Sequence, residues 1–318
     1  MTVPRALITG VSGFAGRHLA RRLLDDGWEV AGTVRSRTSG VPEVAEHRIE
    51  IDDRGALRAL VDAVAPDVVF HLAAIVDTVT TPDVVELHRA NTLGTVAVLE
   101  ALRDTGARPR VLYASSAFAY GHTAADEQPV REEQPLRPLT PYGSSKVAGE
   151  AIALQFGRET GTEVLVTRAF QHTGPGHVGA YALADWARQL AEIEAGPRRG
   201  AIRCGNIDVE RDYCDVRDVA AAYAAVAARG VASAVYNVAS GEPVTMRALL
   251  EGLIRAFGID VAIEVDPARL RRVDQPRFTA DVSRLRADTG WEPEHPLDDT
   301  LAALADFWRR RIAAAAPH

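Results

Sequence analysis

The chain has 318 residues, long enough for about two domains of ordinary size or for one large lobed domain. Hydrophobic residues make up 47% of it and charged residues 25%, which excludes a disordered, collagen-like or coiled-coil chain. The net charge of −7 argues against nucleic acid as a partner, because binding to phosphates needs a basic surface.

Cys204 and Cys214 are the two cysteines, and no Cys or His cluster at metal-ligand spacing accompanies them. This pattern indicates free thiols, with neither a disulfide framework nor a metal site. The longest apolar run, residues 219–228, is well below the ~20 residues that span a bilayer. The first residues hold no apolar stretch typical of a secretory signal. We therefore expect a cytoplasmic protein that has no membrane partner.

Short β-rich runs alternate with amphipathic helical segments through the first half of the chain. Strands are predicted over residues 5–9, 29–34, 68–73, 110–114 and 163–167. Helices are predicted over residues 16–26, 82–104 and 142–160. The alternation is typical of an α/β fold with a doubly wound (Rossmann) parallel sheet that helices cover on both faces.

The pattern changes after residue 170. A glycine-rich loop leads to a predicted helix over 181–195, and residues 261–276 are predicted to form a loop-rich cap. A helix over 216–228 and a strand over 234–239 indicate returns to the sheet region. We therefore predict a dinucleotide-binding domain over residues 1–168, with returns at about 209–240. Residues 169–208 and 241–318 are predicted to form a smaller α/β lobe that binds substrate.

A glycine-rich turn, Gly10-Val11-Ser12-Gly13-Phe14-Ala15-Gly16, lies between the first predicted strand and the first helix. Glycines permit a tight turn and let the backbone approach a pyrophosphate, which then lies at the positive end of the helix dipole. The alternative is that the glycines serve only the turn. Because the motif stands in the first βαβ unit of an alternating chain, it predicts a dinucleotide cofactor.

Two arginines, Arg35 and Arg37, follow the second predicted strand. An acidic residue there would accept hydrogen bonds from the ribose of NAD, whereas an arginine would pair with the 2′-phosphate of NADP. The alternative is that both arginines are solvated loop residues. The pattern favours NADP as the cofactor.

Ser116 ends a predicted strand, and Tyr142 and Lys146 stand one turn apart on the same face of a predicted helix. A lysine ammonium at ~4 Å could stabilise a phenolate by up to ~4 kcal/mol, or about three pKa units. This would bring the pKa of Tyr142 from ~10 toward neutrality, where a general acid works best. A Tyr-x-x-x-Lys pair alone is common by chance, but the glycine turn and Ser116 strengthen the prediction.

Five motifs occur in a recognisable order. They are Gly10-x-x-Gly13-Phe14-x-Gly16, His71-Leu72-Ala73-Ala74, Asn91-x-x-Gly94-Thr95, Ser115-Ser116 and Tyr142-x-x-x-Lys146. In this order they resemble the extended short-chain dehydrogenase/reductase superfamily that acts on nucleotide sugars. The stretch from Arg168 to Gly176, together with Arg211 and Asp274, resembles the GDP-6-deoxy-4-keto-mannose reductases and the related GDP-mannose 4,6-dehydratases.

The resemblance implies roles for four catalytic residues. Tyr142 would exchange the proton with the sugar oxygen, and Ser116 would orient the carbonyl. Lys146 would hold the nicotinamide ribose and lower the pKa of the tyrosine. Asn91 would support the lysine through a relay.

The resemblance also implies two sets of binding residues. The cofactor set is Gly10, Gly13, Phe14, Ala15, Gly16, Arg35, Glu50, Ile51, Leu72, Ala73, Ala74, Tyr142, Lys146 and Phe170. The substrate set is Ser116, Gln171, Arg211, Arg271 and Asp274. Arg211 and Arg271 match positions that bind the nucleotide diphosphate, for which guanidinium groups are suited, and Asp274 matches a ribose contact.

Some positions depart from the pattern of the relatives. Dehydratases carry acidic groups shortly after the catalytic Ser or Thr, whereas this chain has Ala117 and Phe118 there. Neither side chain can donate or accept a proton, so the chain lacks the acid–base groups that a dehydratase needs at these positions. Gln171 stands where the family has Asn, which puts the exact sugar in doubt.

We therefore predict an NADPH-dependent reductase of a nucleotide-linked 4-keto-6-deoxyhexose, with GDP as the favoured nucleotide. The first alternative is a nucleotide-sugar 4-epimerase with a tightly bound cofactor; epimerases mostly use NAD and lack an arginine at position 35. The second is a non-catalytic protein that senses the dinucleotide. The resemblance further implies a homodimer, because helices that correspond to 82–104 and 142–160 commonly pair across a dimer axis in this superfamily.

Overall fold

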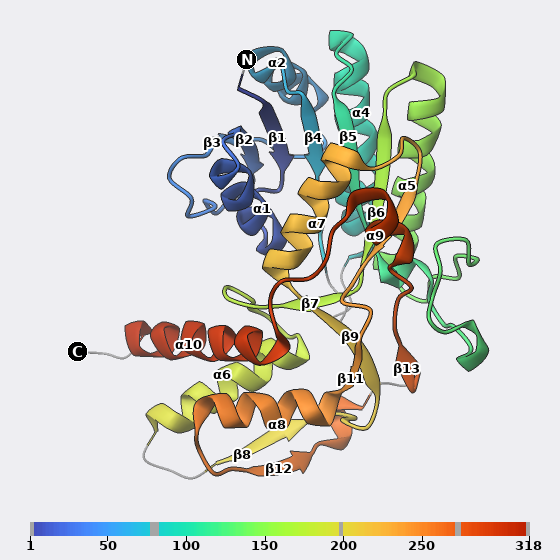
Figure 1. Cartoon of the computed structure of the whole chain (residues 1–318). Helices are drawn as coiled ribbons and strands as arrows, with labels where there is room; N and C mark the ends of the chain where they lie inside the picture. Colours follow the sequence, from blue (N-terminus) through green and yellow to red (C-terminus); the bar gives the residue numbers. More distant parts are fainter. Residues whose placement is uncertain (1–2, 77–82, 197–199, 271–274, 316–318) are drawn as a thin grey trace.

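The computed structural model describes residues 3–76, 83–196, 200–270 and 275–315. Within these residues, seven parallel strands form the main sheet in the order β10-β6-β5-β4-β1-β2-β3 (Figure 1). The strands are β1 (Arg5–Thr9), β2 (Glu29–Val34), β3 (Ala45–Arg48), β4 (Val68–His71), β5 (Arg110–Ser116), β6 (Val164–Ala169) and β10 (Val235–Val238). The predicted doubly wound sheet is confirmed, and β3 is an edge strand that the sequence analysis did not predict.

Helices cover both faces of this sheet. One face packs against α1 (Phe14–Asp25), α7 (Val216–Arg229) and α9 (Ser283–Thr289), and the other against α2 (Arg54–Val64), α4 (Gly94–Thr105) and α5 (Pro141–Thr160). Successive strand residues alternate between the two cores: Ile8 belongs to the first and Leu7 to the second. The strands are therefore apolar on both sides, as buried parallel strands are.

The start of α5 follows from its sequence. The Thr140 hydroxyl accepts a hydrogen bond from the Gly143 amide at 3.0 Å, and Pro141 occupies the first helical position. Both features favour a helix start. Tyr142 thus lies in the first turn of α5 and Lys146 one turn later, on the same face.

The predicted single helix over 82–104 has an irregular centre. The structure has α3 (Val84–His88), a π-helical turn (Arg89–Leu93) and then α4. A π-turn shifts the backbone hydrogen bonds by one residue, and such turns are frequent at functional sites. Here the π-turn contains Asn91, whose side chain is buried.

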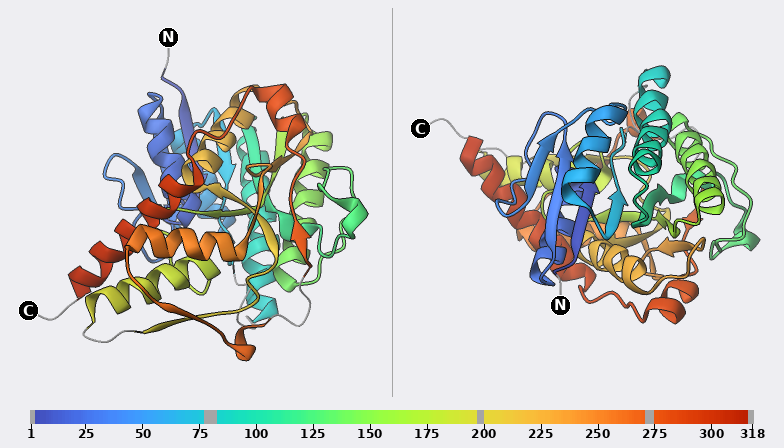
Figure 2. Two further views of the ribbon diagram at one scale, coloured as in Figure 1. Left: turned by 60° about the horizontal axis from the view of Figure 1, so that its bottom comes forward. Right: turned by 90° about the horizontal axis from the view of Figure 1, so that it is seen from above.

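A second lobe lies below the carboxyl ends of the main strands (Figure 1). Its larger sheet contains β7 (Gln171–Thr173), β9 (Glu210–Asp215), β11 (Pro243–Thr245) and β13 (Arg277–Phe278). A strand pair is formed by β8 (Ala201–Cys204) and β12 (Ala262–Val265). The three helices α6 (Ala182–Ala195), α8 (Met246–Phe257) and α10 (Leu297–Ala315) share one apolar core, and Figure 2 (left) shows them side by side.

Two details of this lobe differ from the sequence analysis. The predicted return at about residue 209 starts later, because β9 pairs with β7, β11 and β13 and the main layer resumes with α7. The predicted loop-rich cap contains β12, which pairs in parallel with β8, so that Ile263 is opposite Ile202. Val261, Ile263 and Val265 alternate with Ala262 and Glu264, a short period-two pattern that the sequence analysis did not use.

The chain passes between the two lobes through short connections. Only Phe170 separates β6 from β7, and α7 begins at Val216, directly after the last residue of β9.

Among the described residues, no helix combines the length and the apolar character needed to cross a membrane. The same residues contain no group of three His, Cys, Asp or Glu side chains placed to hold a metal ion.

Candidate active site

A cleft of about 1730 Å³ is lined by residues from both lobes. On the main-sheet side, residues that follow β1, β2 and β4 line it, together with the end of β5. Ligands of open α/β sheets bind at these carboxyl ends. On the opposite side, the cleft is lined by the segment after β6, the start of α6 and residues near β9.

The glycine turn forms one end of the cleft and has space only for glycine. Gly10 has a φ of +73°, and a Cβ atom there would lie 2.8 Å from the Cα atom of Ala73. A Cβ atom on Gly16 would lie 2.5 Å from the carbonyl oxygen of Gly10. Gly13 precedes α1 without a capping side chain, so the first amides of the helix face the cleft without a side-chain acceptor. This cradle fits the pyrophosphate of a dinucleotide.

A group of arginines extends from this turn. Arg35 and Arg37 line the cleft, as does Arg17, whose guanidinium donates to the Ser12 carbonyl at 3.2 Å. Burial and the positive charges of Arg37 and Arg21 lower the pKa of Arg17. An adjoining cavity of about 520 Å³ is also lined by Arg17 and Arg37, and the described residues around it include no carboxylate. Such a group of like charges fits a 2′-phosphate.

The remaining cofactor residues predicted from the sequence also line this cleft. They are Phe14, Ala15, Glu50, Ile51, Leu72, Ala73, Ala74 and Phe170. Behind them, the buried His71 ring lies between two hydroxyls, 2.7 Å from that of Thr9 and 3.0 Å from that of Thr95. Burial lowers the pKa of His71 to about 3, so the ring is neutral. Thr9 also accepts a hydrogen bond from the Ala73 amide at 3.2 Å, which fixes the segment after β4.

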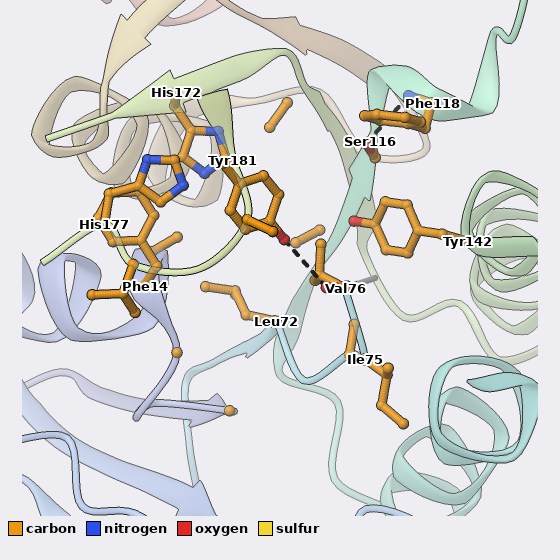
Figure 3. A pocket seen from close by; sticks show the side chains of 18 of the residues that line it. Phe14, Leu72, Ile75, Val76, Ser116, Phe118, Tyr142, His172, His177 and Tyr181 are labelled. Carbon is orange, nitrogen blue, oxygen red and sulfur yellow. Dashed lines mark hydrogen bonds between the residues drawn. The ribbon is translucent and has the colours of Figure 1, made fainter. Parts of the chain in front are cut away.

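Tyr142, Ser116 and Lys146 meet at the centre of the cleft (Figure 3 shows the first two). The ammonium of Lys146 is buried, donates to the Ala114 carbonyl at 2.8 Å and lies 5.8 Å from the centre of the Tyr142 ring. Burial lowers the pKa of Lys146 to about 8. Phe118 packs edge-on against Tyr142, with 5.9 Å between the ring centres.

The pKa of Tyr142 differs from the sequence-based expectation. Burial raises it well above the ordinary value, and the hydrogen bond with Ser116 opposes this shift only in part. The Tyr142 hydroxyl is buried away from water, and the Lys146 ammonium donates a hydrogen bond to the Ala114 carbonyl. Tyr142 is therefore protonated, which is the form that can donate a proton.

Asn91 contacts other groups than Lys146. Its side-chain amide donates to the Ile75 carbonyl and to the Ser145 hydroxyl, both at 3.0 Å, and its oxygen accepts from the Ile75 amide at 2.7 Å. Ser145 in turn donates to the Tyr142 carbonyl at 2.8 Å. Asn91 is thus a positioning residue that ties the segment after β4 to the first turn of α5. Its predicted relay to the lysine stays a prediction.

A buried ion pair that the sequence analysis missed lies beneath these residues. Arg168 on β6 contacts Glu150 on α5 at 2.7 Å, and the hydroxyl of Ser115 also donates to Glu150. Arg168 further donates to the Tyr120 hydroxyl at 3.0 Å. This network connects β5, β6 and α5, the three elements that carry or flank the predicted catalytic residues. Nothing in the local sequence pattern marks the pair, because its partners come from different elements.

The structure describes some of the substrate residues that the sequence predicts, and others lie outside the described residues. Gln171 and Arg211 line the cleft, and Arg211 donates to the carbonyls of Glu210 at 2.8 Å and Gln275 at 2.9 Å. Arg271 and Asp274 lie outside the described residues. Lining residues that the sequence analysis did not select as site residues include His177, Tyr181, Asp185 and Arg269.

Known proteins resemble the chain over nearly its whole length. A GDP-6-deoxy-D-mannose reductase from Pseudomonas aeruginosa is 36% identical over 311 residues, which cover 97% of this chain and 98% of that protein. The structure of RMD from Pseudomonas aeruginosa complexed with NADPH matches with a TM-score of 0.85 and 34% identity, over 97% of this chain and 100% of that one. A UDP-glucose 4-epimerase from Mycolicibacterium smegmatis is 29% identical, over 96% and 99% of the two chains.

The family assignment follows from the same comparisons. Residues 7–304 match the family described as GDP-mannose 4,6 dehydratase, and this stretch contains every motif of the cleft. The seven-stranded sheet of the described residues and the Ser-Tyr-Lys group agree with the resemblance inferred from the sequence. The chain therefore belongs to the GDP-mannose 4,6 dehydratase family.

Proposed function

We propose that this protein reduces a nucleotide-linked 4-keto-6-deoxyhexose of the GDP-4-keto-6-deoxymannose type, with NADPH as the cofactor. The observation that carries the proposal is one cleft in which Tyr142, Ser116 and Lys146 lie beside a glycine turn and a group of arginines. The 36% identical reductase and the NADPH complex of a 34% identical protein support the same reaction. The protein is an oxidoreductase that uses NADPH.

The glycine turn would hold the pyrophosphate of the cofactor, and Arg35 with Arg37 would hold its 2′-phosphate. The segment Leu72 to Ala74 would line the side of the cofactor next to the turn, and Glu50 and Ile51 would contact the adenine. When bound, NADPH supplies the hydride that is added to C4 of the sugar. The cleft would bring donor, acceptor and acid together, and such positioning lowers the barrier to the transfer.

The chain's own residues supply the proton. Tyr142 is buried and protonated, and Ser116 lies beside it. Ser116 can donate a hydrogen bond to the sugar carbonyl while Tyr142 gives its phenolic proton to the oxygen that becomes a hydroxyl. The Lys146 ammonium, 5.8 Å from the centre of the tyrosine ring, stabilises the phenolate left behind.

The side chains around Tyr142 argue against a dehydratase within this family. Removing the elements of water needs an acid and a base near the sugar. Ala117 is buried, and Phe118 packs on the tyrosine ring. A site with these side chains can reduce a carbonyl with Tyr142 as its acid, but it has no second acid–base group at the dehydratase positions.

The finer features of substrate and assembly are also proposals. Arg211, Arg271 and Asp274 would bind the nucleotide, with the diphosphate on the two arginines. We favour GDP because the 36% identical relative is a GDP-6-deoxy-D-mannose reductase. A homodimer through the layer of α4 and α5, a cytoplasmic location and the division into a cofactor domain and a substrate lobe stay predictions.

The test is the loss of NADPH absorbance with GDP-4-keto-6-deoxymannose, run beside NADH and beside a thymidine-linked 4-keto sugar. Stoichiometric oxidation of NADPH with the guanosine substrate is expected. The Tyr142→Phe variant is expected to lose turnover while keeping its NADPH affinity, because it lacks only the proton donor. Preserved activity in this variant would remove Tyr142 as the acid.

The other outcomes separate the alternatives. Reaction of the thymidine substrate alone would keep the chemistry and overturn the nucleotide. If the cofactor binds but neither keto sugar reacts, the 4-epimerase becomes the better assignment, and the 29% identity to a UDP-glucose 4-epimerase then gives the first substrate to try. A protein that binds NADPH and acts on no nucleotide sugar would be the non-catalytic sensor.

A further inference from the structure

Tyr181 is a residue of the cleft to which the sequence analysis assigned no role. It directly precedes α6, on the second lobe, and its half-buried side chain lines the same cleft as Tyr142. Figure 3 shows the hydroxyls of Tyr181 and Tyr142 pointing toward one another across this space. The cleft thus holds the phenol of Tyr181 on the side opposite the proposed catalytic acid.

The ring of Tyr181 is held from the cofactor side. Its centre lies 5.0 Å from that of the His177 ring, which stacks on Phe14 of the glycine turn at 4.6 Å. His177 is itself 3.0 Å from the hydroxyl of Thr173. Burial lowers the pKa of His177 to about 3, so the stack carries no charge. These contacts give the Tyr181 hydroxyl a defined place relative to the cofactor cradle.

The hydrogen bond between Tyr181 and Val76 is long. Its hydroxyl donates to the Val76 carbonyl at 3.2 Å, beyond the 2.5–3.0 Å usual for an O–H···O bond. Val76 is 49% exposed, so water can satisfy its carbonyl once the tyrosine leaves. A ligand hydroxyl in the cleft can therefore replace the Val76 carbonyl in this bond.

The place of the sugar follows from Tyr142 and Ser116, which must both reach the reacting carbonyl oxygen. In a 4-keto-6-deoxyhexose the C3 hydroxyl is the one hydroxyl adjacent to that carbonyl, and it would extend into the space beside Tyr142 that Tyr181 faces. The charge interaction between the two phenols, which contributes to the raised pKa of Tyr142, agrees with their proximity.

We propose that Tyr181 is a substrate-binding residue, whose hydroxyl exchanges the Val76 carbonyl for a sugar hydroxyl adjacent to the reacting carbonyl. This inference rests on the proposed function, since it assumes a sugar bound at Tyr142. The bond fixes the rotation of the sugar ring and so the face of the carbonyl that meets the cofactor. The second lobe thereby contributes to orienting the sugar as well as to binding the nucleotide.

The test compares the binding of two ligands by calorimetry in the presence of NADP⁺: the reduced product GDP-6-deoxymannose and GDP, which has no sugar. Replacing Tyr181→Phe should weaken binding of the product about 3- to 10-fold, the value of one neutral hydrogen bond, and leave binding of GDP within about twofold. The KM for the keto sugar should rise by a similar factor.

A matched control is Tyr236→Phe, which removes a phenol hydroxyl that is bonded to Val231 and Asp288 and does not line the cleft. It should leave both affinities unchanged. Equal weakening of the product and GDP by Tyr181→Phe, or no change in either, would overturn the inference. If the wild-type protein oxidises NADPH with the keto sugar while Tyr181→Phe behaves as wild type, only this inference fails. If the wild-type protein has no such activity, the proposed function fails, and the two affinities still show whether Tyr181 contacts the sugar.

Discussion

Lys146 is a buried cation that lies against a backbone carbonyl and two tyrosine rings. Burial brings its pKa to about 8, while the pKa of Tyr142 lies well above its ordinary value. The ammonium is therefore present below about pH 8 and is lost above it, whereas the phenol stays protonated through this range. Of the two groups, the lysine is the one that titrates near neutral pH.

The expected consequence is a basic limb in the pH profile. The value of kcat/KM for the keto sugar should fall about tenfold per pH unit above about pH 8, because that parameter reports ionisations of the free enzyme. The control is Lys146→Arg, whose guanidinium does not titrate, so its residual activity should lack the limb. The same limb in this variant would assign the titration to another group.

At the scale of one side chain, Arg35 is proposed to determine the preference for NADPH over NADH. Replacing Arg35→Ala should raise the Kd for NADPH about 10- to 100-fold, the value of a hydrogen bond between charged groups, and change that for NADH less than about twofold. The measurement is fluorescence titration with both cofactors. Arg58→Ala, on the exposed surface of α2, is the control. An equal effect of Arg35→Ala on NADPH and NADH would contradict the assignment of the 2′-phosphate.

At the scale of an element, the backbone of the turn between β1 and α1 is proposed to form the cofactor cradle. Gly10→Ala should abolish binding of both NADPH and NADH, since its Cβ atom would lie 2.8 Å from the Ala73 Cα atom and would move the segment after β4. Strain at a φ of +73° adds about 1–3 kcal/mol to the loss of unfolding free energy.

The Gly27→Ala variant separates the effect of backbone strain from the effect of a steric clash. Gly27 has a φ of +83°, and a Cβ atom there would have no atom of the described residues within 4 Å, so this variant should lose stability but bind cofactor normally. Titration of both variants with NADPH, together with urea unfolding, provides the comparison. Normal cofactor binding by Gly10→Ala would show that the cradle tolerates a side chain.

The helices and strands also show which parts of the fold can be predicted from the sequence. Apolar runs and the glycine turn predicted the strands from β1 to β6 apart from β3, because burial on both faces leaves a signal within each run. The π-turn around Asn91 leaves none, since a shift of one hydrogen bond does not change the apolar pattern. The contact of Tyr181 with Val76 joins residues 105 positions apart, so only the fold brings them together. The roles of Arg271 and Asp274 stay predictions.

At the scale of the whole molecule, the layer that contains α3 to α5 presents apolar side chains to solvent. Val85 is 72% exposed and Leu93 57% exposed, next to the helices proposed to form a dimer. Replacing Val85→Glu should shift the mass measured by light scattering toward that of one 34.2 kDa chain, because charge in an apolar interface is costly. Val231→Glu, at another exposed apolar position, should leave the dimer intact. A wild-type monomer would contradict the proposal.

The short connections between the lobes affect how the protein can be made. One face of the main sheet is covered by α1 together with α7 and α9, and the last two helices follow the second-lobe strands β7 and β9 in the chain. Phe70 and Leu112 on that face belong to the same core as Val219 and Val226 of α7. A nascent chain that has reached only residue 170 therefore holds a sheet whose apolar face is covered by α1 but still lacks α7 and α9. Synthesis must proceed beyond Arg229, the last residue of α7, before the cofactor-binding layer can close, so translation pauses within this interval would expose the chain to aggregation.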